Sequence, residues 1–165
     1  MALIKDDAAA PAETWTTLAD EDVAPAEGDV LVPLARWLAE RDALTQREAR
    51  VGVVLQPGDD ALTLAGALEG LALVAVAFPK FTDGRGYSSA RLLRDRLGYT
   101  GELRAIGDVL PDQVFYMRRV GFDAFDLAEG KSVETALAQL KTFSVTYQAG
   151  ADDERPLFRR VQRPA

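Results

Sequence analysis

The sequence predicts an α/β protein whose strands form a mainly parallel sheet. Short runs of β-branched and other apolar residues begin near residues 51, 72, 103 and 123. Segments with apolar residues at helical spacing separate these runs. The starts lie roughly 20–30 residues apart, which is the spacing that successive βα units require. Four such units form either a doubly wound open sheet or half of a (β/α) barrel, and the sequence leaves both arrangements open.

The first 29 residues precede these units and differ from them in composition. They contain eight acidic residues and one lysine, with few apolar side chains to bury. We therefore expect residues 1–29 to form an acidic, loosely ordered arm, either solvated throughout or laid on the body of the protein through Trp15. A helix is expected to follow over residues 32–44, with Pro33 at its first position.

The first βα unit begins with the run VGVVL, which a Pro-Gly turn ends at residues 57–58. Its β-branched residues and its lack of polar alternation are typical of a strand buried on both faces. Residues 61–70 carry apolar side chains at helical spacing, and Gly70 can end that helix. A second buried strand follows over residues 72–79. Strand, helix and strand within about 30 residues predict a parallel crossover.

The later units repeat this alternation. Ser88 or Ser89 can cap the next helix, which Gly98 ends. Pro111 and Asp112 are typical of the opening of a further helix. The expected elements are a helix over residues 89–97, a strand over 103–107, a helix over 111–120, a strand over 123–127 and a helix over 133–143.

Length and composition limit the class of protein. At 165 residues, 48% of them apolar, the chain suits one domain with one core. We expect that domain to span residues 30–148, followed by a C-terminal tail over residues 149–165. The chain contains no cysteine and no histidine, which excludes disulfides, ordinary zinc sites and Ser-His-Asp catalysis. No secretory signal or membrane-spanning run is recognised, so a soluble, cytoplasmic protein is expected.

The net charge of −7 comes from the arm alone. Eight of the 26 acidic residues and one of the 19 basic residues lie in residues 1–29, so the remaining 18 acids and 18 bases cancel. Residues 80–119 hold a small basic excess, which suits a small anion and falls short of a nucleic-acid groove. We therefore expect no nucleic acid and no membrane among the partners.

Polar residues gather where the second and third predicted strands end. Ligands of parallel α/β proteins bind at the carboxyl ends of the strands, because the loops there lead into helix N-termini. This rule selects the candidate ligand-binding residues, which are Lys80, Asp83, Arg85, Tyr87, Ser88, Asp108 and Gln113.

The run DGRGYS, which begins at Asp83, can hold a small oxyanion. Its two glycines allow a close backbone approach, Arg85 offers a fork of donors, and the helix that follows offers free N–H groups. The run is neither a Walker A loop nor a GxGxxG fingerprint, and no cofactor is expected. The alternative is a tight turn in which Arg85 pairs with Asp83.

Two further chemical roles are weaker. Lys80 can act as a base if burial lowers its pKa, although a lone surface lysine is usually solvated. Asp83 and Asp108 could share Mg²⁺, but two acids without a third make a poor site, so no metal is expected. Asp108 and Asp112 fit roles in capping and turns better.

Several motifs together resemble one bacterial family. FPKFTDGRGYS, GELRAIGDVLPDQ, GFDAF and the later Tyr147-Gln148 occur in order within roughly residues 50–148. They are similar to a bacterial family of unknown function that is described as an oxidoreductase linked to sulfite reduction. Genes of that family typically lie beside those for the sulfite reductase haemoprotein and phosphoadenylyl-sulfate reductase.

The resemblance implies a role in assimilatory sulfate or sulfite reduction, with the sulfite reductase haemoprotein as a partner. Because the chain lacks cysteine and histidine, it cannot hold a siroheme or an iron–sulfur centre in the usual way. We therefore expect an accessory protein that binds the reductase or a small oxyanion. The alternative is a small α/β enzyme or anion sensor that uses Lys80, Asp83, Arg85 and Asp108. Whether the protein is an enzyme stays open, as does a homodimer formed by two half-barrels.

Overall fold

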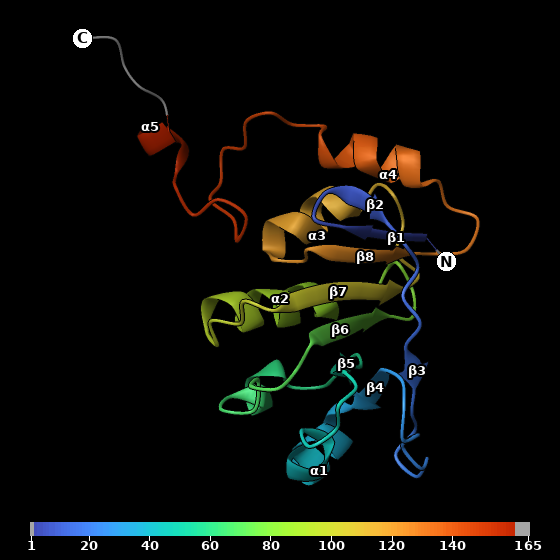
Figure 1. Cartoon of the computed structure of the whole chain (residues 1–165). Helices are drawn as coiled ribbons and strands as arrows, with labels where there is room; N and C mark the ends of the chain where they lie inside the picture. The colour runs from blue at the N-terminus through green and yellow to red at the C-terminus, as the bar shows by residue number, and fades with distance from the viewer. Residues whose placement is uncertain (1, 161–165) are drawn as a thin grey trace.

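One sheet of eight strands organises the protein. The computed structural model describes residues 2–160. The strands lie in the order β2-β1-β8-β7-β6-β5-β4-β3 (Figure 1). They are β1 (Ala2–Lys5), β2 (Ala8–Ala10), β3 (Thr16–Thr17), β4 (Val30–Pro33), β5 (Val51–Leu55), β6 (Leu73–Phe78), β7 (Glu102–Gly107) and β8 (Ala124–Leu127).

The sheet is mostly parallel and is wound in one direction. Each pair of neighbours from β3 to β8 is parallel, whereas β1 runs antiparallel to β8 and β2 antiparallel to β1. From β4 to β8 the order in the sheet is the order in the chain. A doubly wound sheet reverses its order at a switch point. The mainly parallel α/β prediction is therefore confirmed, and of its two alternatives the half-barrel is the one observed.

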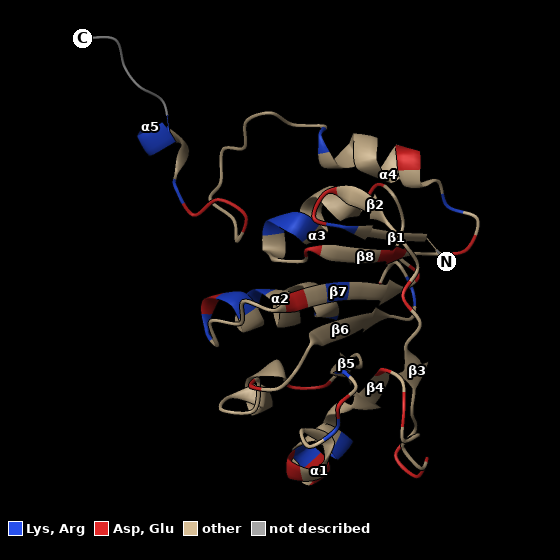
Figure 2. Cartoon of the chain, viewed as in Figure 1, with Lys and Arg blue, Asp and Glu red and all other residues tan. Residues whose placement is uncertain are grey.

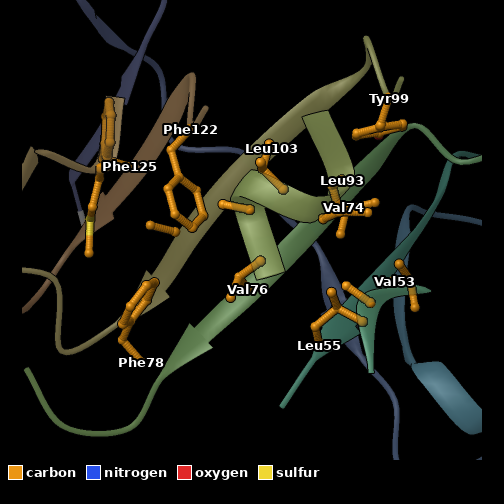
Figure 3. Close-up of a cluster of buried hydrophobic side chains, with 14 of the residues drawn as sticks. Val53, Leu55, Val74, Val76, Phe78, Leu93, Tyr99, Leu103, Phe122 and Phe125 are labelled. Atoms are coloured by element: carbon orange, nitrogen blue, oxygen red, sulfur yellow. The ribbon is translucent and has the colours of Figure 1, made fainter. Parts of the chain in front are cut away.

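All the larger helices cover one face of this sheet. The helical elements are α1 (Leu34–Leu44), the 3₁₀ helix η1 (Ala61–Leu64), α2 (Arg85–Asp95), α3 (Val114–Val120), α4 (Val133–Leu140) and α5 (Leu157–Arg160). Buried side chains of α1 to α4 join alternate strand residues such as Val53, Val74 and Leu103 in one large core. Figure 3 shows Leu93 of α2 among these strand side chains. A second, smaller cluster on the opposite face contains Leu31, Val54, Leu73 and Ala75.

Several predicted helix starts or lengths were wrong. Helix α3 begins at Val114, after the predicted opening at Pro111 and Asp112, and α4 ends at Leu140, before the predicted residue 143. Residues 61–70 form η1 followed by turns, because Gly66 adopts a left-handed conformation with φ of 73° that interrupts a helix. Pro33 does not occupy the first position of α1; it is the extended residue before it and the last residue of β4. Helix α2 begins at Arg85, so Ser88 lies inside it and does not cap it.

Residues 1–29 contain three of the strands, none of which the sequence predicts. A turn at Asp6 and Asp7, with φ of 51° and 60°, joins β1 to β2, and Ile4 of β1 is fully buried. Strand β3 pairs with β4 at the other edge of the sheet. These strands have two to four residues each, too few to produce a recognisable alternation. The arm therefore spans the sheet from one edge to the other (Figure 1).

The middle of the arm lies on the face that carries no helices. Trp15 packs against the smaller apolar cluster, and its Nε1 donates a hydrogen bond of 2.9 Å to Glu13. Glu13 accepts a hydrogen bond of 2.6 Å from Arg104, whose side chain is only 6% exposed. Arg104 also pairs with Glu102 on its own strand. Of the two alternatives for the arm, the one in which Trp15 lies on the body is observed.

Acidic residues are frequent along the arm, and basic residues are frequent on three of the helices. In Figure 2 the acidic residues crowd the arm and the loop after β3, while the basic residues concentrate on α2, α3 and α5. The loop from residue 19 to residue 29 carries five acids and no lysine or arginine. Within residues 2–160, the structure contains no helix with the length and hydrophobicity needed to cross a bilayer.

Candidate functional site

Two loops leave the same edge of the sheet and bring the candidate residues together. Strands β6 and β7 are parallel, and Phe78 at the end of one lies opposite Gly107 at the end of the other. The loop after β6 carries Lys80 and Asp83, and the loop after β7 carries Asp108. Both loops therefore lie at the carboxyl ends of neighbouring parallel strands.

Asp83 and Arg85 are paired with each other. Arg85 donates hydrogen bonds of 2.9 Å from Nε and 2.6 Å from Nη2 to the two carboxylate oxygens of Asp83. The Arg85 backbone N–H donates a third bond of 3.2 Å. These bonds favour the ionised carboxylate and lower the pKa of Asp83 to about 2. The tight-turn alternative thus describes this loop, and an incoming anion would have to compete with Asp83 for the guanidinium.

Asp108 and Gln113 hold the backbone of Phe81. The Phe81 N–H donates a 3.0 Å hydrogen bond to Asp108 Oδ2, and Gln113 Nε2 donates one of 3.0 Å to the Phe81 carbonyl. Gly107 comes just before, with φ of 97°, and a Cβ there would lie 2.5 Å from the Phe78 carbonyl oxygen. Asp108 and Gln113 therefore fix the position of the β6 loop.

The remaining candidates differ in burial. Lys80 and Ser88 are exposed. Tyr87 is half-buried and packs edge-on against Phe78, with ring centroids 5.3 Å apart, and against Tyr116 at 5.3 Å. Burial raises the pKa of the Tyr87 hydroxyl. Tyr87 therefore packs α2 onto the sheet and onto α3.

A first hollow lies between the loop after β5 and the start of α2. Its volume is about 260 Å³, and Arg85 and Ser88 are the candidates that line it. Residues of the β5 loop, among them Gly58 and Asp59, form its other wall. The Asp59 carboxylate already accepts a 2.7 Å hydrogen bond from the Gln56 N–H. The candidate residues are thus divided, with Asp108 and Gln113 holding Phe81 and only Arg85 and Ser88 facing this hollow.

A second hollow of about 430 Å³ lies on the helical face, between α2, α3 and the segment that follows α4. It is lined by Tyr87, Arg91, Tyr116, Arg119 and residues 148–150. Arg119 is buried. Its guanidinium donates hydrogen bonds to the Gln148 carbonyl and to Asp152, the latter 2.6 Å long.

Sequence reasoning missed Arg119. Its position near the end of a helix is typical of a solvated cation, and the residues that bury it lie about 30 positions further along the chain. Among residues 2–160, no group of three acidic, cysteine or histidine side chains is arranged to hold a metal ion.

Comparison with known families identifies the chain. Residues 52–158 match the family model described as "Bacterial protein of unknown function (DUF934)". The chain belongs to this family. Both hollows lie within the part matched by DUF934, whereas β1 to β4 and α1 precede it. No curated protein matches the chain.

Proposed function

We propose that this DUF934 protein is an accessory protein of assimilatory sulfate and sulfite reduction, and that it acts by binding the sulfite reductase haemoprotein. The observation that carries the proposal is that polar groups at the strand ends are bonded to other groups of the protein. Arg85 is paired with Asp83, and Asp108 holds the backbone of Phe81. These groups maintain a loop, so they are not free to act as acids, bases or nucleophiles in the way an active site requires.

The exposed aromatic residues support a binding role. Tyr116 on α3 is 59% exposed and Phe143, which follows α4, is 60% exposed. Both lie on the helical face beside the hollows that α2, α3 and the segment after α4 form. Aromatic residues are enriched where proteins bind one another, because they bury a large apolar area at a small cost in conformational entropy. The link to sulfite reduction rests on the family resemblance that the motifs FPKFTDGRGYS and GELRAIGDVLPDQ carry.

Co-purification tests this proposal. The tagged chain and the sulfite reductase haemoprotein from the same cells should elute as one complex at physiological salt. Tyr116→Ala should weaken the complex about tenfold, as expected for a central aromatic contact. Leu62→Ala is the control, since Leu62 is also exposed, at 42%, but lies in η1 away from α3. A haemoprotein that elutes alone from the wild-type chain would contradict the proposal.

A second candidate function is an anion sensor, which the first hollow favours. Arg85 and Ser88 line it at the start of α2, an 11-residue helix whose first N–H groups can bind an anion. Its ligand would be sulfate or sulfite.

Calorimetry with sodium sulfate and sodium sulfite tests the sensor. Arg85→Ala should weaken binding about tenfold or more, because a charge-assisted hydrogen bond is lost. Asp83→Asn should strengthen binding, because it removes the competing carboxylate. Arg96→Ala, at the other end of the same helix, is the control. An affinity unchanged by both Arg85→Ala and Asp83→Asn would exclude this site.

A further inference from the structure

The segment after α4 has the pattern of a β-strand but is not paired as one. In residues 143–147, FSVTY, apolar and hydroxyl side chains alternate, and every residue type is common in strands except serine. Phe143, Val145 and Tyr147 are 60%, 62% and 79% exposed. A strand with this alternation normally buries its apolar side against another element. The apolar side of this segment is therefore available to a partner.

The backbone of the segment is also available. Among the hydrogen bonds of residues 2–160, none is donated by the backbone N–H groups of residues 143–149. Two carbonyls do accept bonds, that of Thr146 from Arg160 at 2.6 Å and that of Gln148 from Arg119. These bonds hold the segment on the protein and leave its donors unpaired. Unpaired donors next to exposed apolar side chains are the features by which a strand edge recruits another strand.

The order of the five residues makes the segment complementary to itself. In an antiparallel pair of two copies centred on Val145, Phe143 lies opposite Tyr147 and Ser144 lies opposite Thr146. Aromatic pairs and pairs of hydroxyl side chains are both favourable across antiparallel strands. In the same register Thr142 faces Gln148 and Lys141 faces Ala149, so no like charges come opposite each other.

We propose that residues 143–147 pair antiparallel with the same residues of a second copy, and that this pairing forms a two-fold symmetric homodimer. Such an interface is isologous, with the same surface contributed by both subunits. Phe143 already packs edge-on against Phe115 of α3, with centroids 5.1 Å apart, so the ribbon of two strands lies against α3 in each subunit. Tyr116 on the same helix supplies further apolar area.

The dimer is expected to be of moderate affinity. The free segment bends at Ser144 and at Tyr147, and it has to straighten in order to pair. Two short strands alone are marginally stable in water, so the contacts with α3 are needed. The dissociation constant should therefore lie in the range of about 1–10 μM, corresponding to roughly −7 to −8 kcal/mol. Neither sulfite nor the reductase enters this inference, and the dimer would compete with the reductase for the exposed Phe143 and Tyr116.

Sedimentation velocity of the full chain, at concentrations spanning the expected constant, tests the pairing. The wild-type protein should pass from its monomer mass of 17.9 kDa to twice that mass. Val145→Glu and Val145→Lys should each raise the dissociation constant at least about tenfold, because like charges then face each other at the centre of the pair. An equimolar mixture of the two variants should dimerise again, because opposite charges then face each other.

Val23→Glu is the matched control. Val23 is 91% exposed in the acidic loop, so the same substitution there should leave the dimer unchanged. A wild-type chain that stays monomeric at about 100 μM would overturn the proposal, as would a Val145→Glu variant that dimerises like the wild type. A mixture of the Glu and Lys variants that stays monomeric would exclude the two-fold register centred on Val145. No reductase is present in this experiment, so its failure would leave the proposed function standing.

Discussion

Two segments outside the βα units lie on the surface of this protein. Their compositions would suggest that the first is solvated and the second is packed, and the structure shows the reverse. Residues 13–18 of the arm are surrounded by acidic residues, yet Trp15 and Glu13 hold them on the helix-free face, and Leu18 is buried in the large core. Residues 143–147 are rich in apolar side chains, yet these side chains are exposed.

The difference teaches that hydrophobicity alone does not decide whether a segment docks within its own chain. The arm has a strand edge to pair with, since the Leu18 N–H donates a 2.8 Å hydrogen bond to the Leu31 carbonyl. It also has a buried counter-charge in Arg104. Within residues 2–160, the segment after α4 is held by arginines at two carbonyls and by the packing of Phe143 against Phe115. A polar segment can therefore dock through specific partners, whereas an apolar segment with fewer of them keeps most of its side chains exposed.

The largest effect expected from this comparison is that of Arg104→Ala. The substitution leaves Glu102 and Glu13 without their shared partner in a site where Arg104 is only 6% exposed. Removing one member of a buried charge cluster costs about 3 kcal/mol of unfolding free energy. Urea denaturation measures it. Arg160→Ala, which removes a partner of the Thr146 carbonyl, should cost less than about 1 kcal/mol. Equal losses would contradict the comparison.

Trp15→Ala should have a smaller effect. The indole is half-buried against the smaller apolar cluster and lies under Arg50, 4.8 Å from its guanidinium carbon. Its loss should lower the unfolding free energy by about 2 kcal/mol and speed hydrogen exchange at the Leu18 amide.

Tyr147→Ala is the counterpart on the other segment. Tyr147 is 79% exposed, so a change in the stability of the monomer beyond about 0.5 kcal/mol is not expected. The two variants should be compared by urea denaturation at a protein concentration below that of dimer formation. A Tyr147→Ala variant as destabilised as Trp15→Ala would mean that Tyr147 packs on its own chain.

A pH dependence of the arm sharpens the comparison further. The Trp15 N–H and the Arg104 guanidinium lower the pKa of Glu13 from 4.5 to about 2. A depressed pKa contributes stability that is fully present above the unfolded value of 4.5 and lost as the pH falls towards 2. The stability difference between wild type and Glu13→Gln should therefore be constant above about pH 5 and shrink below it. A difference that stays the same from pH 6 to pH 3, measured by urea denaturation, would contradict the role of Glu13.

The elements that could be predicted are those whose signal lies within a short stretch of the sequence. Residues 51–55 and 73–78 are strands close to the predicted bounds, because a run of buried β-branched residues is a local signal. The three strands of the arm were missed, because each becomes a strand only through a partner elsewhere, as β1 does beside β8. The prediction of a helix over residues 61–70 was wrong, because it relied on the spacing of apolar residues and did not consider that Gly66 could interrupt the helix.

The candidate site divides in the same way. The pair of Asp83 and Arg85 could be anticipated, since the residues are two positions apart and share one turn. The contacts of Asp108 and Gln113 with Phe81 could not, because 27 and 32 residues separate the partners. The burial of Arg119 likewise depends on a segment beyond α4.

By itself, the sequence determined the α/β class, the parallel units from residue 51 onward and the edge of the sheet to which the polar loops belong. Periodicity and turn residues act over a few positions, so they can be recognised in the sequence alone. Only the tertiary structure decided that the sheet winds as a half-barrel, that the acidic arm lies across its helix-free face, and that the apolar side chains of residues 143–147 stay exposed. Those outcomes depend on which distant residues meet, such as Glu13 with Arg104, and no local pattern encodes that meeting.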